Sequence, residues 1–89
     1  MKIWKYPLDP SLKQTLSLPV GAKILDVQVQ DNTPCLWALV NENTQVKESR
    51  HLVMYFTGSD IPDEPGDYIA TFQLNGLVIH LFQISTDEE

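Results

Sequence analysis

Residues 67–84 read DYIATFQLNGLVIHLFQI and carry the strongest local folding signal in the chain. Two runs rich in β-branched and aromatic residues, Asp67–Leu74 and Leu77–Ile84, are separated by the dipeptide Asn75-Gly76. Asn-Gly is preferred in two-residue type I′ turns because both central residues need a positive φ. The segment therefore predicts a C-terminal β-hairpin that turns at Asn75-Gly76.

Five further short strands are expected upstream of this hairpin, separated by Pro, Gly, Asn and Asp. They are Lys2–Tyr6, Gln14–Leu18, Lys23–Gln30, Cys35–Val40 and Arg50–Thr57. The third alternates Leu25, Val27 and Val29 with polar residues, which predicts one buried face. The fourth is apolar at every position, so we expect a central strand that is covered on both faces.

The segments between these strands have the composition of turns and loops. Asp31-Asn32 is expected to form a turn, and the polar segment Asn41–Glu48 a mobile loop. Gly58–Asp67 contains two prolines, two glycines and four carboxylates, which predicts a long surface loop. The chain is therefore predicted to be all-β, with about seven short, mostly antiparallel strands in a sandwich or a partly open barrel.

The length of 89 residues leaves room for one hydrophobic core. We expect residues 1–86 to form a single small β domain and residues 87–89 an acidic C-terminal tail. Because so small a core has no disulfide to support it, self-association is expected to add stability. The single Cys35 cannot form an internal bridge, and its position at the start of an apolar run indicates a small buried hydrophobe in a reducing compartment.

The sequence also predicts where the protein works. Met1–Pro7 alternates polar and apolar residues without a small-residue cleavage site, so it is not expected to be a signal peptide. The longest apolar run, Cys35–Val40, is far shorter than the roughly 20 residues that span a bilayer. We therefore expect a cytoplasmic protein without membrane contact.

The charge of the chain disfavours nucleic acid as a partner. Twelve acidic and six basic residues give a formal net charge of −6. Binding to a phosphate backbone needs Lys and Arg gathered on one face, and here they are scattered along the sequence. An acidic DNA mimic is a minor alternative, although many of the carboxylates are concentrated in residues 60–67 and 87–89.

Metal-binding residue types are present as Cys35, His51 and His80, together with the acidic loop over residues 60–67. Zinc ligands normally occur in close pairs, whereas these three residues stand singly on three expected strands. The loop lacks the ligand spacing of an EF-hand, and its two prolines restrict how it could surround an ion. No metal and no other cofactor is expected. The sequence leaves open whether the three residues cluster in space and whether the loop binds a cation.

No catalytic pattern is visible in the sequence. It contains no glycine-rich phosphate loop, no Ser/His/Asp pattern and no nucleotide-binding fingerprint. Cys35 follows Pro34 rather than a helix N-terminus, so its thiol lacks the usual environment of a nucleophile. A glycosidase pair in the acidic loop would need a deep cleft, which a domain of this size rarely builds. The protein is therefore predicted not to be an enzyme.

Aromatic and polar side chains are the remaining groups that could contact a ligand, by stacking or by hydrogen bonding. Among them, Trp37 lies in the fully apolar strand and is expected in the core. Trp4 and Tyr6 lie in a terminal strand, and such strands often form an exposed sheet edge. The residues predicted to bind a ligand or partner are Trp4, Tyr6, Arg50, His51 and His80, with Tyr55 and Tyr68 as further candidates.

Four segments occur together in a familiar order and spacing: WKYP (4–7), GAKILDVQVQ (21–30), PCLWALV (34–40) and PGDYIATFQL (65–74). In these segments the chain resembles a family of small uncharacterised proteins found in bacteriophages, prophages and their hosts. The resemblance runs from about Ile3 to Phe82. It implies a small phage-encoded protein in the cytoplasm of a bacterial host, and it implies no specific activity.

Two classes of function are consistent with these observations. The leading hypothesis is a non-enzymatic, phage-type accessory protein that self-associates or engages a host protein through a sheet surface or edge. The alternative is a small-molecule binder that sequesters a nucleotide-like signal and so counters bacterial defence. It would use Trp4, Tyr6, Arg50, His51 and His80, although the negative charge of the chain weighs against it.

Overall fold

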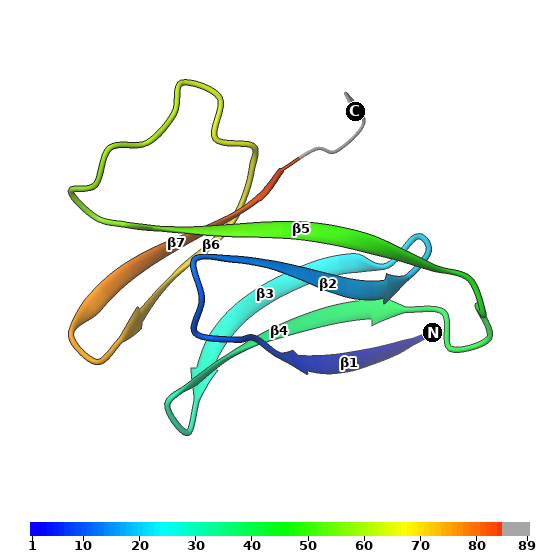
Figure 1. Ribbon diagram of the computed structural model, residues 1–89. Helices are drawn as coiled ribbons and strands as arrows, with labels where there is room; N and C mark the ends of the chain where they lie inside the picture. Colours follow the sequence, from blue (N-terminus) through cyan, green and yellow to red (C-terminus); the bar gives the residue numbers. More distant parts are fainter. Residues whose placement is uncertain (85–89) are drawn as a thin grey trace.

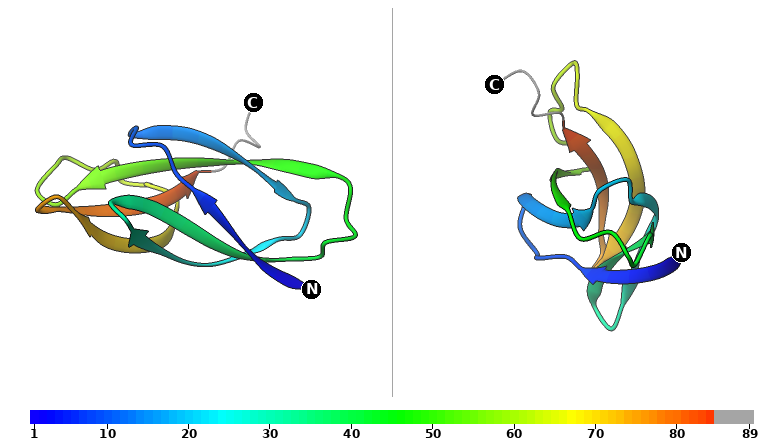
Figure 2. Two further views of the ribbon diagram at one scale, coloured as in Figure 1. Left: turned by 90° about the horizontal axis from the view of Figure 1, so that it is seen from below. Right: turned by 90° about the vertical axis from the view of Figure 1, so that its right-hand side faces the viewer.

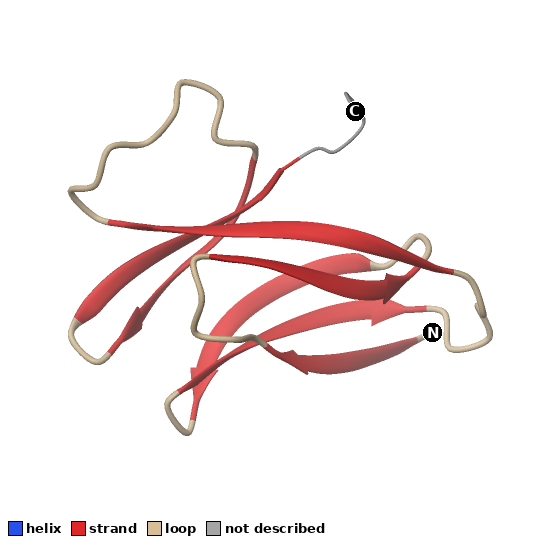
Figure 3. Ribbon diagram, in the orientation of Figure 1, coloured by secondary structure: helices blue, strands red, loops and turns tan. Residues whose placement is uncertain are grey.

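The computed structural model describes residues 1–84, which form seven β-strands and no helix (Figures 1 and 3). The strands are β1 (Lys2–Pro7), β2 (Lys13–Pro19), β3 (Lys23–Gln30), β4 (Thr33–Val40), β5 (Lys47–Phe56), β6 (Asp67–Leu74) and β7 (Leu77–Ile84). All of their pairings are antiparallel, so the predicted all-β class is confirmed. Within residues 1–84 there is no helix of the length and apolarity needed to cross a membrane.

The strands form two sheets, a three-stranded sheet of order β1-β4-β3 and a four-stranded sheet of order β2-β5-β7-β6. These sheets pack face to face as a sandwich and do not close into a barrel (Figure 2). β1 and β2 follow one another in the chain but belong to different sheets. On the other side of the sandwich, Cα atoms of β3 and β6 approach within 8 Å although the two strands are not hydrogen-bonded neighbours.

Two tight turns set the register of the sandwich. Asn75 and Gly76 have φ values of 52° and 82°, so both adopt the positive φ that the sequence predicts. Asp31 and Asn32, with φ values of 53° and 64°, connect β3 to β4 in the same way. The predicted hairpin and the predicted turn are both confirmed.

The core lies between the two sheets and is formed by inward-facing aliphatic side chains. Leu18, Leu36, Leu52 and Leu81 are fully buried and come from β2, β4, β5 and β7. Burying one leucine contributes about 1.5–3 kcal/mol relative to leaving it exposed. These four residues therefore hold both sheets together.

Leu25 does not follow the predicted alternation of β3. A β-bulge between Ile24 and Asp26 leaves Leu25 45% exposed, and Ile24 packs against the core instead. Ile24 and Leu25 are both apolar, so the sequence does not reveal that the alternation shifts there. The prediction that Leu25 is buried is wrong, whereas the prediction for Val27 is confirmed.

β4 is the central strand of its sheet, as predicted, but no second layer from residues 1–84 covers its outward face. Trp37, which was expected in the core, lies on this face and is only half-buried. The Nζ atom of Lys5 lies 5.8 Å from the centre of the Trp37 ring and donates a 2.8 Å hydrogen bond to Gln30 Oε1. The ammonium group of Lys5 thus lies over the Trp37 ring on this face, in a cation–π arrangement.

The polar loop predicted over residues 41–48 is shorter than expected because β5 already begins at Lys47. Lys47, Glu48 and Ser49 pair with the end of β2, at Pro19, Leu18 and Ser17. Strand pairing with β2 thus overrides the polar composition of this segment.

Candidate functional site

The outward-facing side of the sheet β2-β5-β7-β6, called the outer face here, carries the most distinctive surface of the molecule. Alternation along each strand places one residue in two on this face. Its members are Lys13, Thr15, Ser17, Lys47, Ser49, His51, Val53, Tyr55, Tyr68, Thr71, Gln73, Val78, His80, Phe82 and Ile84. In the described strands, none of these positions holds a carboxylate, and only the two lysines are charged.

Three aromatic rings, the aromatic patch, meet on the outer face. Phe82 of β7 lies between Tyr55 of β5 and Tyr68 of β6. The centroid distances from the Phe82 ring are 5.7 Å to Tyr55 and 5.6 Å to Tyr68, with interplanar angles of 67° and 70°. This edge-to-face geometry is the favourable arrangement for aromatic pairs. The three rings therefore form one contiguous cluster, in which Tyr68 is 60% exposed.

Tyr68 reaches the outer face because of a second β-bulge. The register of β6 against β7 shifts between Tyr68 and Ala70, so Tyr68 lies opposite Phe82. An uninterrupted strand would place Tyr68 on the same side as the inward-facing Ala70 and Phe72. The bulge thus assembles the aromatic patch.

A chain of hydrogen bonds runs beside the aromatic patch. The Tyr68 hydroxyl lies 2.8 Å from Thr71 Oγ1, which in turn lies 3.0 Å from His80 Nδ1. The other ring nitrogen of His80, Nε2, lies 2.7 Å from Thr57 Oγ1. Hydroxyl groups can donate or accept, so this chain can satisfy either protonation state of His80. It holds the imidazole in one orientation.

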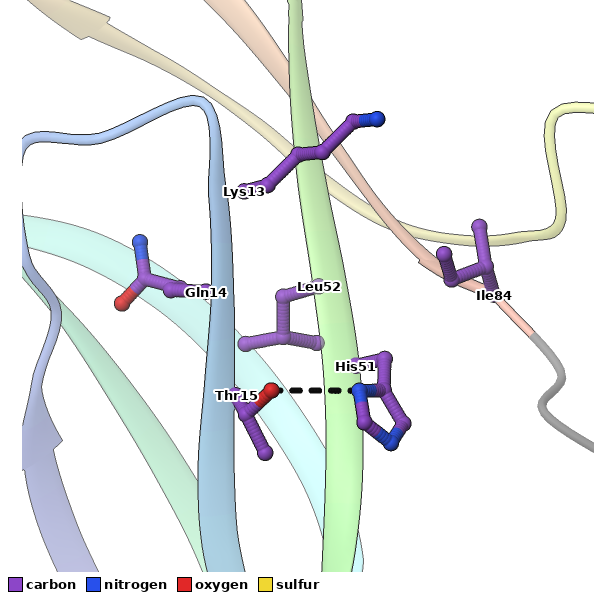
Figure 4. A pocket seen from close by; sticks show the side chains of 6 residues that line it. All are labelled: Lys13, Gln14, Thr15, His51, Leu52 and Ile84. Carbon is purple, nitrogen blue, oxygen red and sulfur yellow. Dashed lines mark hydrogen bonds between the residues drawn. The ribbon is translucent and has the colours of Figure 1, made fainter.

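A hollow of about 220 Å³ adjoins the patch at the β2 side of the outer face (Figure 4). It is lined by Lys13, Gln14, Thr15, His51, Leu52 and Ile84. Thr15 Oγ1 lies 3.1 Å from His51 Nδ1, and the structure gives Nε2 of His51 no hydrogen-bond partner within residues 1–84. The hollow thus presents one lysine, one imidazole nitrogen and one hydroxyl to solvent.

Arg50, predicted to bind a ligand, faces inward from β5. Its Nε and Nη2 groups donate to Glu48 Oε2 over 3.0 and 2.8 Å, and Nη2 also donates to the Ala22 carbonyl over 2.7 Å. A weaker bond of 3.4 Å runs from Nη1 to Gln83 Oε1. The guanidinium is therefore engaged by the protein itself and ties β5, β7 and the β2–β3 connection together.

Trp4 and Tyr6, also predicted to bind, lie on β1 in the other sheet. They share the inward side of this edge strand, where Tyr6 packs against the core and Trp4 remains partly exposed. Burial raises the pKa of the Tyr6 phenol above its ordinary value of 10.0. The five predicted residues thus lie in three places: Trp4 and Tyr6 on β1, Arg50 on the inward side of β5, and His51 and His80 on the outer face.

The metal-binding residue types are likewise separated. Cys35 is buried on β4, in the sheet opposite to the one that carries His51 and His80. Within residues 1–84, no group of three His, Cys, Asp or Glu side chains is arranged to hold a metal ion, and this range includes the acidic loop.

A polar groove of about 470 Å³ lies where β3 approaches β6. Asp26, Gln28, Thr71 and Gln73 contribute its polar side chains. Asp26 accepts hydrogen bonds from the Val27 amide at 2.7 Å and from Gln28 Nε2 at 2.8 Å. Cα atoms of the two strands approach within 8 Å, whereas an inserted strand would need about 9.5 Å between its neighbours. The groove is too narrow to take a strand.

Phe82, Thr57 and Thr71 were not predicted as site residues. A two-residue turn at Asn75-Gly76 places Thr71 opposite His80, so the contact between these two residues could be inferred from the predicted hairpin. The contact of Phe82 with Tyr55 depends on the pairing of β5 with β7, which local patterns do not reveal.

A family model described as "Domain of unknown function (DUF7352)" matches residues 1–89. No curated protein and no solved structure matches the chain.

Proposed function

We propose a function for this chain from the composition of its outer face. Over residues 1–89 the chain belongs to the family described as "Domain of unknown function (DUF7352)". The protein acts as a non-enzymatic binding module that contacts another protein through this face. One observation carries the proposal: the chain has a net charge of −6, yet no outward position of the described strands on this face holds a carboxylate.

The composition of the outer face supports this role. The centres of protein interfaces are depleted of charged residues and enriched in Tyr, Phe and Trp. Tyr68 and Phe82 offer large apolar contacts at a low entropic cost, since neighbouring rings already restrict them. The hydroxyls of Thr57, Thr71 and Tyr68 can form hydrogen bonds around such an anchor.

The partner proposed first is a second copy of this chain, and a host protein is the other. A small core benefits from self-association, and the outer face brings only two charged side chains, Lys13 and Lys47, toward a second copy. The resemblance to phage and prophage proteins supports the wider context, an accessory protein in the cytoplasm of a bacterial host.

Sedimentation velocity over a range of protein concentrations tests the proposal. The wild-type chain should form a dimer, and Tyr68→Ser should weaken dimerisation at least about tenfold, because an aromatic anchor is lost. Ile3→Ser is a matched control: Ile3 and Tyr68 are both 60% exposed, but Ile3 lies on the other sheet. This control should dimerise like the wild type.

The salt dependence of dimerisation and an experiment to capture host proteins complete the test. Two copies that each carry −6 repel one another, so dimerisation should strengthen as salt rises, whereas a basic host partner would bind more weakly. The proposal is overturned if the wild type stays monomeric and captures no host protein. It is also overturned if Tyr68→Ser leaves every interaction unchanged.

The second candidate, sequestration of a nucleotide-like signal, is favoured by the hollow with Lys13, His51 and Thr15. Its volume of about 220 Å³ falls below the roughly 300–1,000 Å³ of ordinary ligand pockets, and Arg50 is already engaged by Glu48. Thermal-shift screening against cyclic nucleotides tests this candidate, and the absence of any shift excludes it. The minor DNA-mimic alternative gains no support from the outer face, because its outward positions in the described strands hold no carboxylate.

A further inference from the structure

A cavity of about 190 Å³ opens at one end of the sandwich, away from the outer face. It lies between the β1–β2 connection, the start of β4 and the hairpin that turns at residues 75–76. The turn of this hairpin is at the left of Figure 1. Pro34, Met54 and Ile79 form its buried floor, whereas Leu12 and Leu77 form an exposed rim. The cavity is therefore open to solvent at this rim.

The cavity offers an occupant almost no polar contact. Among the described residues that line it, only Ser11 has a polar side chain, and its hydroxyl donates to the Lys13 carbonyl over 3.2 Å. Phe56 and Leu74 complete the apolar walls. A charged or strongly polar molecule would lose its hydration there without compensation, so the lining selects an uncharged apolar one.

The β1–β2 connection is fixed, which keeps the cavity open. The Gln14 side chain accepts the Asp9 amide at 3.0 Å and donates to the Asp9 and Ser11 carbonyls at 2.9 and 3.3 Å. The Met54 amide donates to the Leu12 carbonyl at 2.8 Å. These bonds fix the backbone of the connection and so the position of Leu12 at the rim. The site is preformed.

We infer that this end cavity binds one small, uncharged apolar molecule about the size of a six-membered ring. An engineered protein cavity of about 150 Å³ lined by Leu, Ile and Phe stays dry and binds benzene. The present cavity has a similar lining and a slightly larger volume of about 190 Å³. This site is independent of the proposed protein contact on the outer face.

Titration with benzene, followed through the methyl signals of Met54, Ile79 and Leu77 by NMR, tests the inference. Saturable shifts are expected for these methyl groups and for those of Leu12 and Leu74, which also line the cavity, with a dissociation constant on the order of 1 mM for a ligand of this size. Intermolecular nuclear Overhauser effects from benzene to Met54 and Ile79 should locate it in the wild-type protein. Pyrimidine, a polar ring of the same shape, should bind at least about tenfold more weakly.

Two variants and one control complete the design. Ile79→Phe should fill the cavity from its floor and abolish the shifts, and Leu77→Ser should weaken binding by removing part of the rim. Leu25→Ser is the matched control, since Leu25 is 45% and Leu77 50% exposed, and it should bind benzene like the wild type. Shifts that rise linearly without saturation, that spread to Leu25, or that persist unchanged in both cavity variants would overturn the inference. If Ile79→Phe does not fold, the wild-type Overhauser effects and Leu77→Ser decide the outcome.

Discussion

Arg50 has a different role in the structure from the one that the sequence suggests. In the sequence it is a cation near aromatic residues, which suggests a group for binding phosphate. In the structure its side chain is only 15% exposed and donates to Glu48 and to the Ala22 carbonyl. The residue therefore serves the fold, by joining β5 to the β2–β3 connection.

The first prediction concerns Arg50→Met. The change leaves the Ala22 carbonyl and the Glu48 carboxylate without their donors, and the free energy of unfolding should fall by about 1–3 kcal/mol. The estimate stays moderate because the Glu48 side chain is 39% exposed and can be hydrated. Urea unfolding measures the effect.

The control for Arg50→Met is Lys47→Met on the same strand. Lys47 is exposed, so its replacement should change the free energy of unfolding by no more than about 0.5 kcal/mol. Equal stability of the two variants would show that the contacts of Arg50 contribute nothing to the fold.

At the scale of the strands, two β-bulges determine which side chains reach the surface. The bulge of β3 exposes Leu25, and the bulge of β6 brings Tyr68 next to Phe82. Each inserts one residue and so inverts the alternation on one side of it. The aromatic patch therefore depends on the register of β6 as much as on its amino acids.

The second prediction concerns Gly66, directly before β6. Its φ is +107°, and a Cβ atom there would lie 2.5 Å from the Gln83 carbonyl oxygen. Gly66→Ala should therefore lower the free energy of unfolding by about 2 kcal/mol or more, since both the backbone angle and the contact are unfavourable. Thermal or urea unfolding measures the loss.

Gly58→Ala is the matched control, because Gly58 also has a positive φ, +91°, but no atom lies within 4 Å of its added Cβ. It should lose only the backbone contribution, about 1 kcal/mol. A Gly66→Ala variant no less stable than Gly58→Ala would contradict the close approach of residue 66 to β7.

At the scale of the whole molecule, the sandwich has both central and edge strands. β4, β5 and β7 each pair on two sides, whereas β1, β2, β3 and β6 pair on one side only. β1 is also the most exposed strand, with only Tyr6 partly buried. The molecule should therefore open first at β1.

The third prediction follows from this arrangement. In native-state hydrogen exchange, the hydrogen-bonded amides of β1 should exchange at least about tenfold faster than those of β4, because β1 can separate while the core stays intact. The measurement is made at a protein concentration at which the chain is monomeric. Equal protection of β1 and β4 under these conditions would mean that the edge does not open locally.

Much of the fold is visible in local patterns because strand formation depends on near neighbours. The bounds of β3, β6 and β7 match the predicted ranges, and the turns at Asp31-Asn32 and Asn75-Gly76 have the positive φ values that their residues favour. The candidate site is harder to predict from the sequence than the fold. His51 and His80 were identified, but their separation from Arg50, Trp4 and Tyr6 depends on which strand joins which sheet.

The hairpin over residues 67–84 illustrates which features the sequence determines and which depend on the tertiary structure. Its turn and its two strands follow from the amino acids of the segment alone, because a two-residue Asn-Gly turn imposes both geometry and register. The bulge that turns Tyr68 outward, the pairing of β7 with β5 and the inward orientation of Arg50 all depend on contacts between residues distant in the chain. Such contacts are selected by the packing of the whole core, so only the tertiary structure places the aromatic patch on the outer face and the apolar cavity at the end of the sandwich.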